Sequence, residues 1–211
     1  MLLPDDYICI GIVAKHCDNS KLCVAERQAL DFDLSSLFCD FWNEILEYWN
    51  EVDAYDLAVK NCNGDTTCIS LIPTVIDYQD KKSLIYGGVF QNCSGKNRNF
   101  EGVKKIAVLY AYSRYVILNG WNDTPTGFVT KENEFSIPKT LKELESFADR
   151  YRTMGYEIFK RAEMFLCNKK EIFTDFNSKN CVGCGCSCEK CGNVTLAKGY
   201  GIRGNNITKI L

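Results

Sequence analysis

The sequence predicts a mainly α fold, in which a small antiparallel helical bundle carries a long inter-helix loop and an extended C-terminal tail. Apolar residues recur at helical spacing in three stretches, 34–50, 99–119 and 140–167. The loop between the last two stretches, residues 121–138, has no helical period and is long enough for a short β-hairpin. After residue 193 the chain is rich in Gly and Asn with only short apolar pairs, which is typical of an extended segment.

The composition is that of a folded chain with little charge imbalance. The 211 residues include 25 Lys and Arg and 27 Asp and Glu, a net charge of −2, and 46% are hydrophobic. With 12% aromatic residues the chain can bury enough surface to offset its conformational entropy, which excludes disorder throughout. Bulk nucleic-acid binding needs a basic face, so this balance argues against it. The length suits one domain with extensions or two small domains.

The first 32 residues show no helical period and are predicted to be an irregular N-terminal segment. A strand-like apolar run from Tyr7 to Val13 leads into a polar loop that contains His16 and Cys17. Asp33 is then a fair N-cap for a helix over 34–50, whose apolar residues lie at i, i+3, i+4 and i+7.

Residues 50–98 are open to two interpretations. Asp53 to Asp56 is predicted to be a solvated helix end. The stretch from Val75 to Tyr86 fits either a helix or two short strands, with Pro73 before it and Gly87-Gly88 after it as breaks.

Two long helices follow. The first has Asn99 as its expected N-cap and Gly120 as its stop. The second begins with a capping box of Thr140 and Glu143 and keeps an apolar face as far as residue 166, with one ion pair expected between Glu157 and Arg161. We expect these two helices to pack antiparallel, with the helix over 34–50 adding a third face.

The N-terminus is predicted to carry no export signal. Asp5 and Asp6 stand where a signal peptide has Lys or Arg, and the apolar run from Tyr7 to Ala14 is far shorter than the ~20 residues that span a bilayer. We therefore expect a cytosolic product with no membrane partner, and most of the 13 cysteines reduced.

Three regions follow from the change in composition along the chain. Residues 1–170 are the predicted helical core, residues 171–193 a Cys-rich linker, and residues 194–211 a C-terminal docking tail. Such a tail cannot build a core, so it is either disordered or lies on a partner's surface, for instance as an added strand.

Five cysteines gather in the linker as Cys181-x-x-Cys184-x-Cys186-x-Cys188-x-x-Cys191. Two Cys-x-x-Cys knuckles can supply four thiolates to zinc in tetrahedral geometry. Only three residues separate the knuckles, whereas a zinc ribbon has ~15–20 there, so a second pair such as Cys62 and Cys68 would have to contribute. We therefore favour a flexible, reduced loop and expect no cofactor, with zinc at Cys181–Cys191 as the alternative.

No other motif supports catalysis, and the chain is predicted not to be an enzyme. Gly199-x-Gly201-x-x-Gly204 has the letters of a dinucleotide-binding loop, but no strand and helix flank it and too little chain follows for a ribose-binding acid. His16 and Cys17 are adjacent, which rarely lets an imidazole activate a thiol, and no third orienting group is visible.

The loop 121–138 is a candidate contact surface. Thr124-Pro125 and Gly127 set a turn, after which residues 128–135 fit a short extended arm or hairpin. Phe128 and Phe135 would be costly to expose unless a neighbouring surface covers them. An interaction role and ordinary packing under the helices are about equally supported.

A longer pattern extends across this loop and both of its helices. An aromatic-rich helix over 107–118 leads into Thr124-Pro125-x-Gly127-Phe128-Val129-x-Lys131 and Glu134-x-Ser136-x-Pro138, and the long helix after it contains Tyr151-Arg152 and Gly155-Tyr156. Over residues 99–167 this pattern resembles the head–tail connector, or adaptor, proteins of tailed bacteriophages, most closely the neck ring proteins of crAss-like gut phages.

The resemblance implies a structural protein of the virion neck, made in the cytoplasm of the host bacterium. Similar proteins form a ring, usually of twelve copies, which docks beneath the portal, extends the DNA channel toward the tail and meets further neck or tail rings. During ejection the DNA passes through without sequence-specific binding, and a near-zero net charge fits such a channel wall. The C-terminal segment of these proteins commonly grips the portal.

The predicted interaction sites are therefore the loop and the tail. In the loop, the residues expected to contact a neighbouring subunit or the next ring are Phe128, Val129, Lys131, Glu134 and Phe135. In the tail, the residues expected to dock on the portal are Val194, Leu196, Tyr200, Ile202, Ile207 and Ile210. The alternative function is that of a small metal-binding or redox-responsive regulatory protein organised around Cys181–Cys191.

Overall fold

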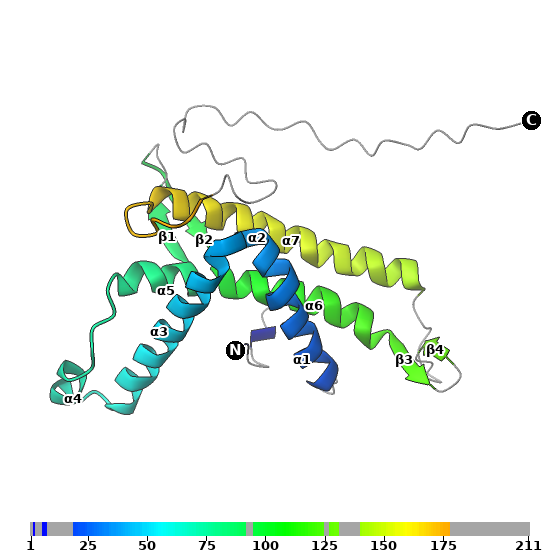
Figure 1. The fold of residues 1–211 in the computed structure, drawn as a ribbon, viewed down its shortest axis with the longest axis horizontal. Coiled ribbons are helices and arrows are strands. Elements are labelled where there is room, and N and C mark those ends of the chain that lie inside the picture. Colours follow the sequence, from blue (N-terminus) through cyan, green and yellow to red (C-terminus); the bar gives the residue numbers. More distant parts are fainter. Residues whose placement is uncertain are drawn as a thin grey trace, which may run out of the picture.

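The computed structural model describes residues 2, 6–7, 19–91, 95–124, 127–130 and 140–177, and only the backbone of the strands at 121–124 and 127–130. Helices account for most of these residues, which confirms the mainly α class (Figure 1). Two long helices, α6 (Val103–Asn119) and α7 (Leu141–Asn168), run antiparallel and side by side along the body. Two small antiparallel hairpins lie at opposite ends of this pair.

Helix α7 begins as the sequence predicts. Thr140 Oγ1 accepts a hydrogen bond from the Glu143 N–H at 3.3 Å, and the Glu143 carboxylate accepts one from the Thr140 N–H at 2.9 Å, which confirms the capping box. The predicted pair between Glu157 and Arg161 is wrong. Glu157 bonds Lys160 at 3.0 Å, and Arg161 pairs at 2.6 Å with Glu101, just before α6.

Residues 19–61 are almost continuously helical, so the prediction of an irregular segment is wrong for residues 19–32, and that of one helix over 34–50 is wrong as well. Helix α1 (Asn19–Gln28) continues through a π-helical turn (Ala29–Leu34) into α2 (Ser35–Phe38), and after a 3₁₀ turn α3 (Trp42–Asn61) begins. Cys39 breaks the run because its φ is +51°, outside the α-helical region. Asp33 lies inside the π-helical turn and caps no helix.

The third face against α6 comes from α1 and its π-helical turn (Figure 1). Leu22, Ala25 and Ala29 are buried at i, i+3 and i+7, and the two small side chains let the helix axes approach closely. Beyond this contact the chain adds an aromatic core, in which Phe38 meets the edge of Phe159 with ring centroids 5.1 Å apart.

Helix α3 extends away from the helix pair and forms a lobe (residues 42–86) with α4 (Thr66–Ser70) and α5 (Tyr78–Tyr86) (Figure 1). Residues 78–86 are thus helical, which settles the two interpretations of this stretch. A disulfide joins Cys62 to Cys68, and the Asp65 carboxylate caps α4. Asp53 to Asp56 lies within α3 and is not a helix end, because α3 continues to residue 61.

The first hairpin pairs β1 (Gly88–Gln91) with β2 (Asn97–Phe100). Asn99 lies in β2 opposite Val89, so its predicted role as the N-cap of α6 is wrong. Gly102 takes that position, with φ +84°, directly against Gly87, with φ +91°. A Cβ on Gly102 would lie 2.4 Å from the Gly87 backbone nitrogen, so the hairpin can close onto α6 only because both residues are glycine.

Helix α6 ends at Asn119 with Gly120 as its C-cap, which confirms Gly120 as the predicted stop. Within the described ranges, no helix is both long and apolar enough to cross a lipid bilayer.

Candidate interaction surfaces

The residues predicted to make contacts fall mostly outside the described ranges. Phe128 and Val129 belong to β4, of which only the backbone is described. The others lie outside the described residues: in the loop Lys131, Glu134 and Phe135, in the tail Val194, Leu196, Tyr200, Ile202, Ile207 and Ile210, and also the cluster Cys181–Cys191, the pair His16 and Cys17, and the Gly199–Gly204 motif.

A hairpin forms in the inter-helix loop, as predicted, but its strands flank the turn at 124–127, whereas the sequence placed the arm or hairpin after that turn, at 128–135. Strands β3 (Trp121–Thr124) and β4 (Gly127–Thr130) pair antiparallel, with Trp121 opposite Thr130 and Thr124 opposite Gly127. The hairpin projects beyond the end of α6 (Figure 1). Among the described elements, α6, which leads into it, contacts it most, and that contact is small.

A hollow of about 540 Å³ lies at the base of this hairpin, where the end of α6 meets the start of α7. Most of its lining is aromatic or aliphatic, from Tyr112, Tyr115, Val116, Leu144 and Phe147, and its one charged lining residue is Glu143. Phe147 is 47% exposed and packs edge-on against Tyr151, with ring centroids 5.3 Å apart. It also borders a second hollow of about 450 Å³, which Lys142 and Arg150 line.

The lobe tip (residues 53–77) exposes large apolar side chains at the other end of the molecule. Leu57, Leu71 and Ile76 are 59%, 80% and 77% exposed, and α4 has no buried residue. A group of apolar side chains this exposed is typical of a contact surface.

Polar contacts hold α5 against α3 and give the lobe a fixed shape. The Tyr86 hydroxyl donates to Asp53, and the Tyr78 hydroxyl donates to Asp56, which also pairs with Lys82 at 2.9 Å. Burial, and then the hydrogen bond to Asp53, raises the pKa of Tyr86. Burial alone would raise the pKa of Asp56, but the hydrogen bonds from Tyr78 and Lys82 lower it below its usual value, so Asp56 is charged at neutral pH.

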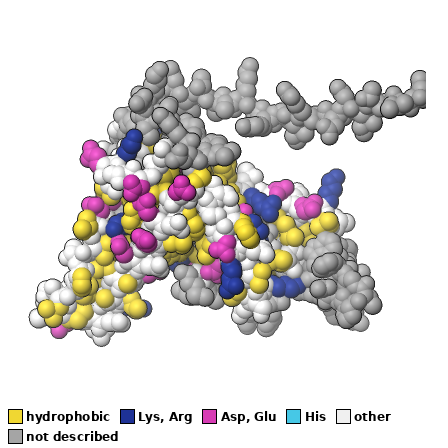
Figure 2. Space-filling view, in the orientation of Figure 1, with side chains coloured by type: hydrophobic (Ala, Val, Ile, Leu, Met, Phe, Trp, Pro, Cys, Tyr) yellow, Lys and Arg dark blue, Asp and Glu magenta, His cyan; other side chains and the backbone are white. Residues whose placement is uncertain are grey.

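Opposite charges gather on the two parts of the molecule. The lobe, residues 42–86, has eight Asp and Glu against three Lys, a net charge of −5. The helix pair with β2, residues 97–119 and 140–170, has eleven Lys and Arg against six Asp and Glu, a net charge of +5. On the face drawn in Figure 2, acidic side chains are concentrated toward the lobe and most basic ones lie toward the other end.

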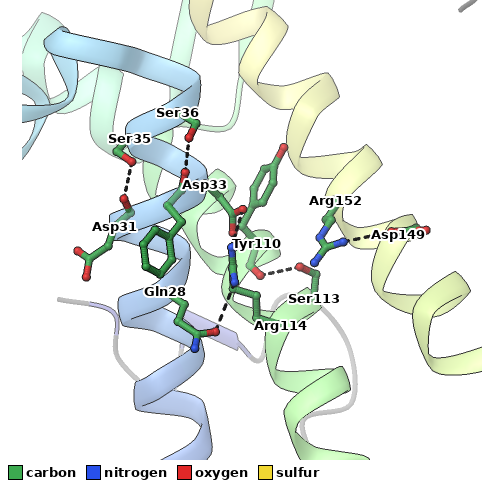
Figure 3. A network of polar contacts seen from close by, with 11 residues as sticks. Gln28, Asp31, Asp33, Ser35, Ser36, Tyr110, Ser113, Arg114, Asp149 and Arg152 are labelled. Atoms are coloured by element: carbon green, nitrogen blue, oxygen red, sulfur yellow. Dashed lines mark hydrogen bonds and ion pairs between the residues drawn. The ribbon is translucent and has the colours of Figure 1, made fainter. Parts of the chain in front are cut away.

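Arg114 on α6 fixes the π-helical turn in place (Figure 3). Its Nε and Nη2 donate to the Asp33 carboxylate at 2.6 and 2.9 Å, and its Nη1 donates to Gln28 Oε1 at 3.3 Å. The Phe32 ring lies 5.8 Å from the guanidinium carbon. A π-helical turn often marks a functional site. Here, however, the Arg114 guanidinium is engaged by Asp33 of the turn, so this contact serves to orient α1 on α6.

The described cysteines form no metal centre. Cys62 and Cys68 are joined to each other and so cannot serve as a second thiolate pair while oxidised, whereas Cys23, Cys39 and Cys167 are not disulfide-bonded. No group of three or more His, Cys, Asp or Glu within the described ranges is placed to hold a metal ion.

Sequence reasoning missed the hollow and the lobe tip. Phe147 and Met154 are seven residues apart on α7 and lie off its predicted apolar face, which is a signal for an exposed apolar patch. Leu71 and Ile76 follow no period, so only the structure reveals their exposure.

The fold and surfaces define a small, elongated, mainly helical protein with a projecting hairpin and exposed apolar surfaces at both ends. Residues 64–185, more than half of the chain, match a family described as a family of unknown function, DUF6712, and the chain belongs to that family. No curated protein and no solved structure matches the chain.

Proposed function

We propose that the protein is a structural adaptor of a tailed-bacteriophage virion, which assembles with copies of itself into a ring below the portal and extends the DNA channel toward the tail. The observation that carries this proposal is the β3–β4 hairpin, which lies within the segment that resembles phage connectors and projects from the helix pair. The proposed role is structural, and no bond-making step is part of it.

Within the described residues β3 and β4 pair with no further strand, and such a hairpin favours assembly for a physical reason. Two strands without a third strand or a covering helix are at best marginally stable in water. Both hairpin edges also present backbone groups that can pair with another chain. A ring, in which each hairpin lies against the next subunit or the next ring, supplies the missing cover.

The C-terminal segment and the net charge fit the same role. The sequence of residues 194–211 contains too few apolar residues for a core, and in this proposal it docks on the portal. The net charge of −2 over the whole chain allows DNA to slide through the ring without being held. The expected copy number of twelve comes from the resemblance alone.

Imaging of purified protein by negative-stain electron microscopy, alone and mixed with the portal protein of the same phage, tests this proposal. We expect closed rings with a central channel, stacked on the portal in the mixture. Single particles of monomer size in both samples would contradict it.

A variant in each hairpin makes the test specific. Phe128→Asp places a charge in the β3–β4 hairpin and is expected to abolish rings. Val89→Asp in the β1–β2 hairpin, where Val89 is already 66% exposed, is the matched control and is expected to leave them intact.

A further inference from the structure

The outer part of the lobe is tied to the rest of the molecule mainly by the disulfide between Cys62 and Cys68. Figure 1 shows α4 at the outer end of the lobe. None of residues 63–77, all of which the structure describes, is buried, and no other described helix or strand packs extensively against α4. A helix of five residues is far too short to be stable by itself, so α4 depends on its links to its neighbours, of which the bridge is the covalent one.

We propose that Cys62 and Cys68 form a reversible thiol–disulfide switch, which small thiols such as glutathione open in the folded protein. Opening the bridge releases residues 63–77, and oxidised glutathione closes it again. The released segment includes Leu71 and Ile76, so the redox state of the solution determines whether this exposed apolar surface is ordered. The inference goes beyond the proposed adaptor role and does not depend on the ring.

The two cysteines differ in exposure, which determines where a thiol attacks. Cys62 is only 8% exposed at the end of α3, whereas Cys68 is partly exposed on α4. A thiolate needs an open path to the sulfur that it attacks, so we expect the attack at Cys68. Because α4 has no buried residue, this attack requires no unfolding of the helical body.

The reaction is a thiol–disulfide exchange in two steps. A glutathione thiolate forms a bond to Cys68 Sγ, the bond between Cys62 and Cys68 breaks, and Cys62 leaves as a thiolate that takes a proton from water. A second glutathione thiolate attacks the glutathione sulfur of this mixed disulfide and releases Cys68, which is protonated in turn. Two thiols are thereby oxidised to one disulfide while the protein bridge is reduced, and closure is the reverse reaction.

The backbone around Cys62 favours closure. The Cys62 N–H donates to the Ala58 carbonyl at 3.2 Å, and the Asp65 N–H donates to the Cys62 carbonyl at 2.9 Å, so the turn after α3 has bonds other than the bridge. Cys68 follows Cys62 by only six positions. The entropy lost on closing so short a loop is small, and the two thiols therefore stay close enough to pair again.

The base of the lobe has links that do not involve the bridge. The Tyr86 hydroxyl donates to Asp53, Lys81 pairs with Glu51 at 2.7 Å, and two residues of α5, Leu84 and Ile85, are buried in the core. The release is therefore expected to end at residue 77, where α5 begins.

Differential alkylation and hydrogen exchange of the full chain, both measured by mass spectrometry, test the switch. The protein is first treated with oxidised glutathione and then with reduced glutathione under conditions in which circular dichroism shows the body to be folded. The double variant Cys62→Ser with Cys68→Ser controls for the other cysteines of the chain. Cys39→Ser, which removes a cysteine outside the disulfide, is the matched single control.

We expect reduced glutathione to make Cys62 and Cys68 available to alkylation together, in wild type and in Cys39→Ser. Exchange in residues 63–77 should become at least tenfold faster while α6 stays protected, and oxidised glutathione should reverse both changes. The double variant should exchange rapidly over residues 63–77 and not respond to glutathione. Early in the reduction, rapid alkylation should trap glutathione on Cys68 at least ten times as often as on Cys62.

Four results would overturn the switch. They are a bridge that opens only when α6 also loses protection, an opening that leaves exchange in residues 63–77 unchanged, a pair that oxidised glutathione does not close, and an equal response to glutathione in the double variant. Glutathione trapped mainly on Cys62 would overturn the assigned point of attack.

Discussion

At the scale of single residues, the approach of α6 to α7 depends on Gly155. A Cβ at this position would lie 2.7 Å from Cε2 and 2.9 Å from Cδ2 of the buried Tyr110 ring. The glycine therefore costs helix propensity within α7 but permits the two helices to pack closely.

Gly155→Ala is expected to lower the free energy of unfolding by about 1–3 kcal/mol, because the overpacking outweighs the gain in helix propensity. Urea unfolding followed by circular dichroism measures the change. Ser146→Ala, on the exposed face of the same helix, is the control and should be neutral or slightly stabilising. Equal stability of the two variants would show that the helices can separate without cost.

A second contact that depends on single residues is the ion pair between Arg114 on α6 and Asp33 in the π-helical turn. The pair is bidentate, and its side chains are 22% and 17% exposed, so water screens it only partly. Arg114→Lys keeps the charge but loses the fork geometry, and we expect a loss of about 1–2 kcal/mol of stability. A double-mutant cycle with Asp33→Asn should return a coupling above ~0.5 kcal/mol; a value near zero would mean that the π-helical turn is held by packing alone.

At the scale of elements, the parts that the sequence predicts are those with local signals. The capping box at Thr140 and the stop at Gly120 are set by neighbouring residues, and both are confirmed. Helix α1 was missed because its buried residues are Leu22, the small Ala25 and the charged Glu26, which together give little hydrophobic periodicity. Asn99 was misplaced because pairing with Val89 depends on a contact across the hairpin, which no local pattern records.

The junction between the β1–β2 hairpin and α6 depends on two facing glycines. In Gly102→Ala the alanine would have to adopt a positive φ, and its Cβ would lie 2.4 Å from the backbone of Gly87. We therefore expect the free energy of unfolding to fall by at least about 2 kcal/mol. Gly64→Ala is the control, because Gly64 has φ +85° but no atom within 4 Å of the added Cβ. Chemical denaturation should show the larger loss for Gly102→Ala, and equal losses would mean that the backbone conformation alone matters.

The disulfide is expected to order the lobe tip without supporting the body. Because α4 has no buried residue, replacing Cys62 and Cys68 by Ser should speed hydrogen exchange in residues 63–71 and leave exchange in α6 unchanged. Cys39→Ser, which removes a cysteine outside the disulfide, is the control. Faster exchange throughout the body would contradict this division.

At the scale of the whole molecule, the sequence predicts a contact surface in the loop 121–138 but not the surfaces around it. The hairpin follows from turn residues close together in the chain, Thr124, Pro125 and Gly127. The hollow combines Tyr112 with Phe147 across two helices, and the lobe tip depends on how α3 leaves the body, so neither has a local signal.

The tail is expected to act in docking and not in folding. Deletion of residues 194–211 should leave the helical content and unfolding temperature of the monomer unchanged but abolish binding to the portal protein, as measured by surface plasmon resonance. Asn205→Ser with Asn206→Ser, which keeps every apolar residue of the tail, is the control and should bind like wild type. Equal portal affinity of the truncated chain would contradict the role of the tail.

The central claim is that this chain finishes burying its apolar surface only against copies of itself. Native mass spectrometry of the purified wild type at low ionic strength tests it most directly, since one chain has a mass of 24.0 kDa. The account predicts a closed oligomer of one defined copy number that Phe128→Asp dissociates. A single species of 24.0 kDa at every concentration would contradict it.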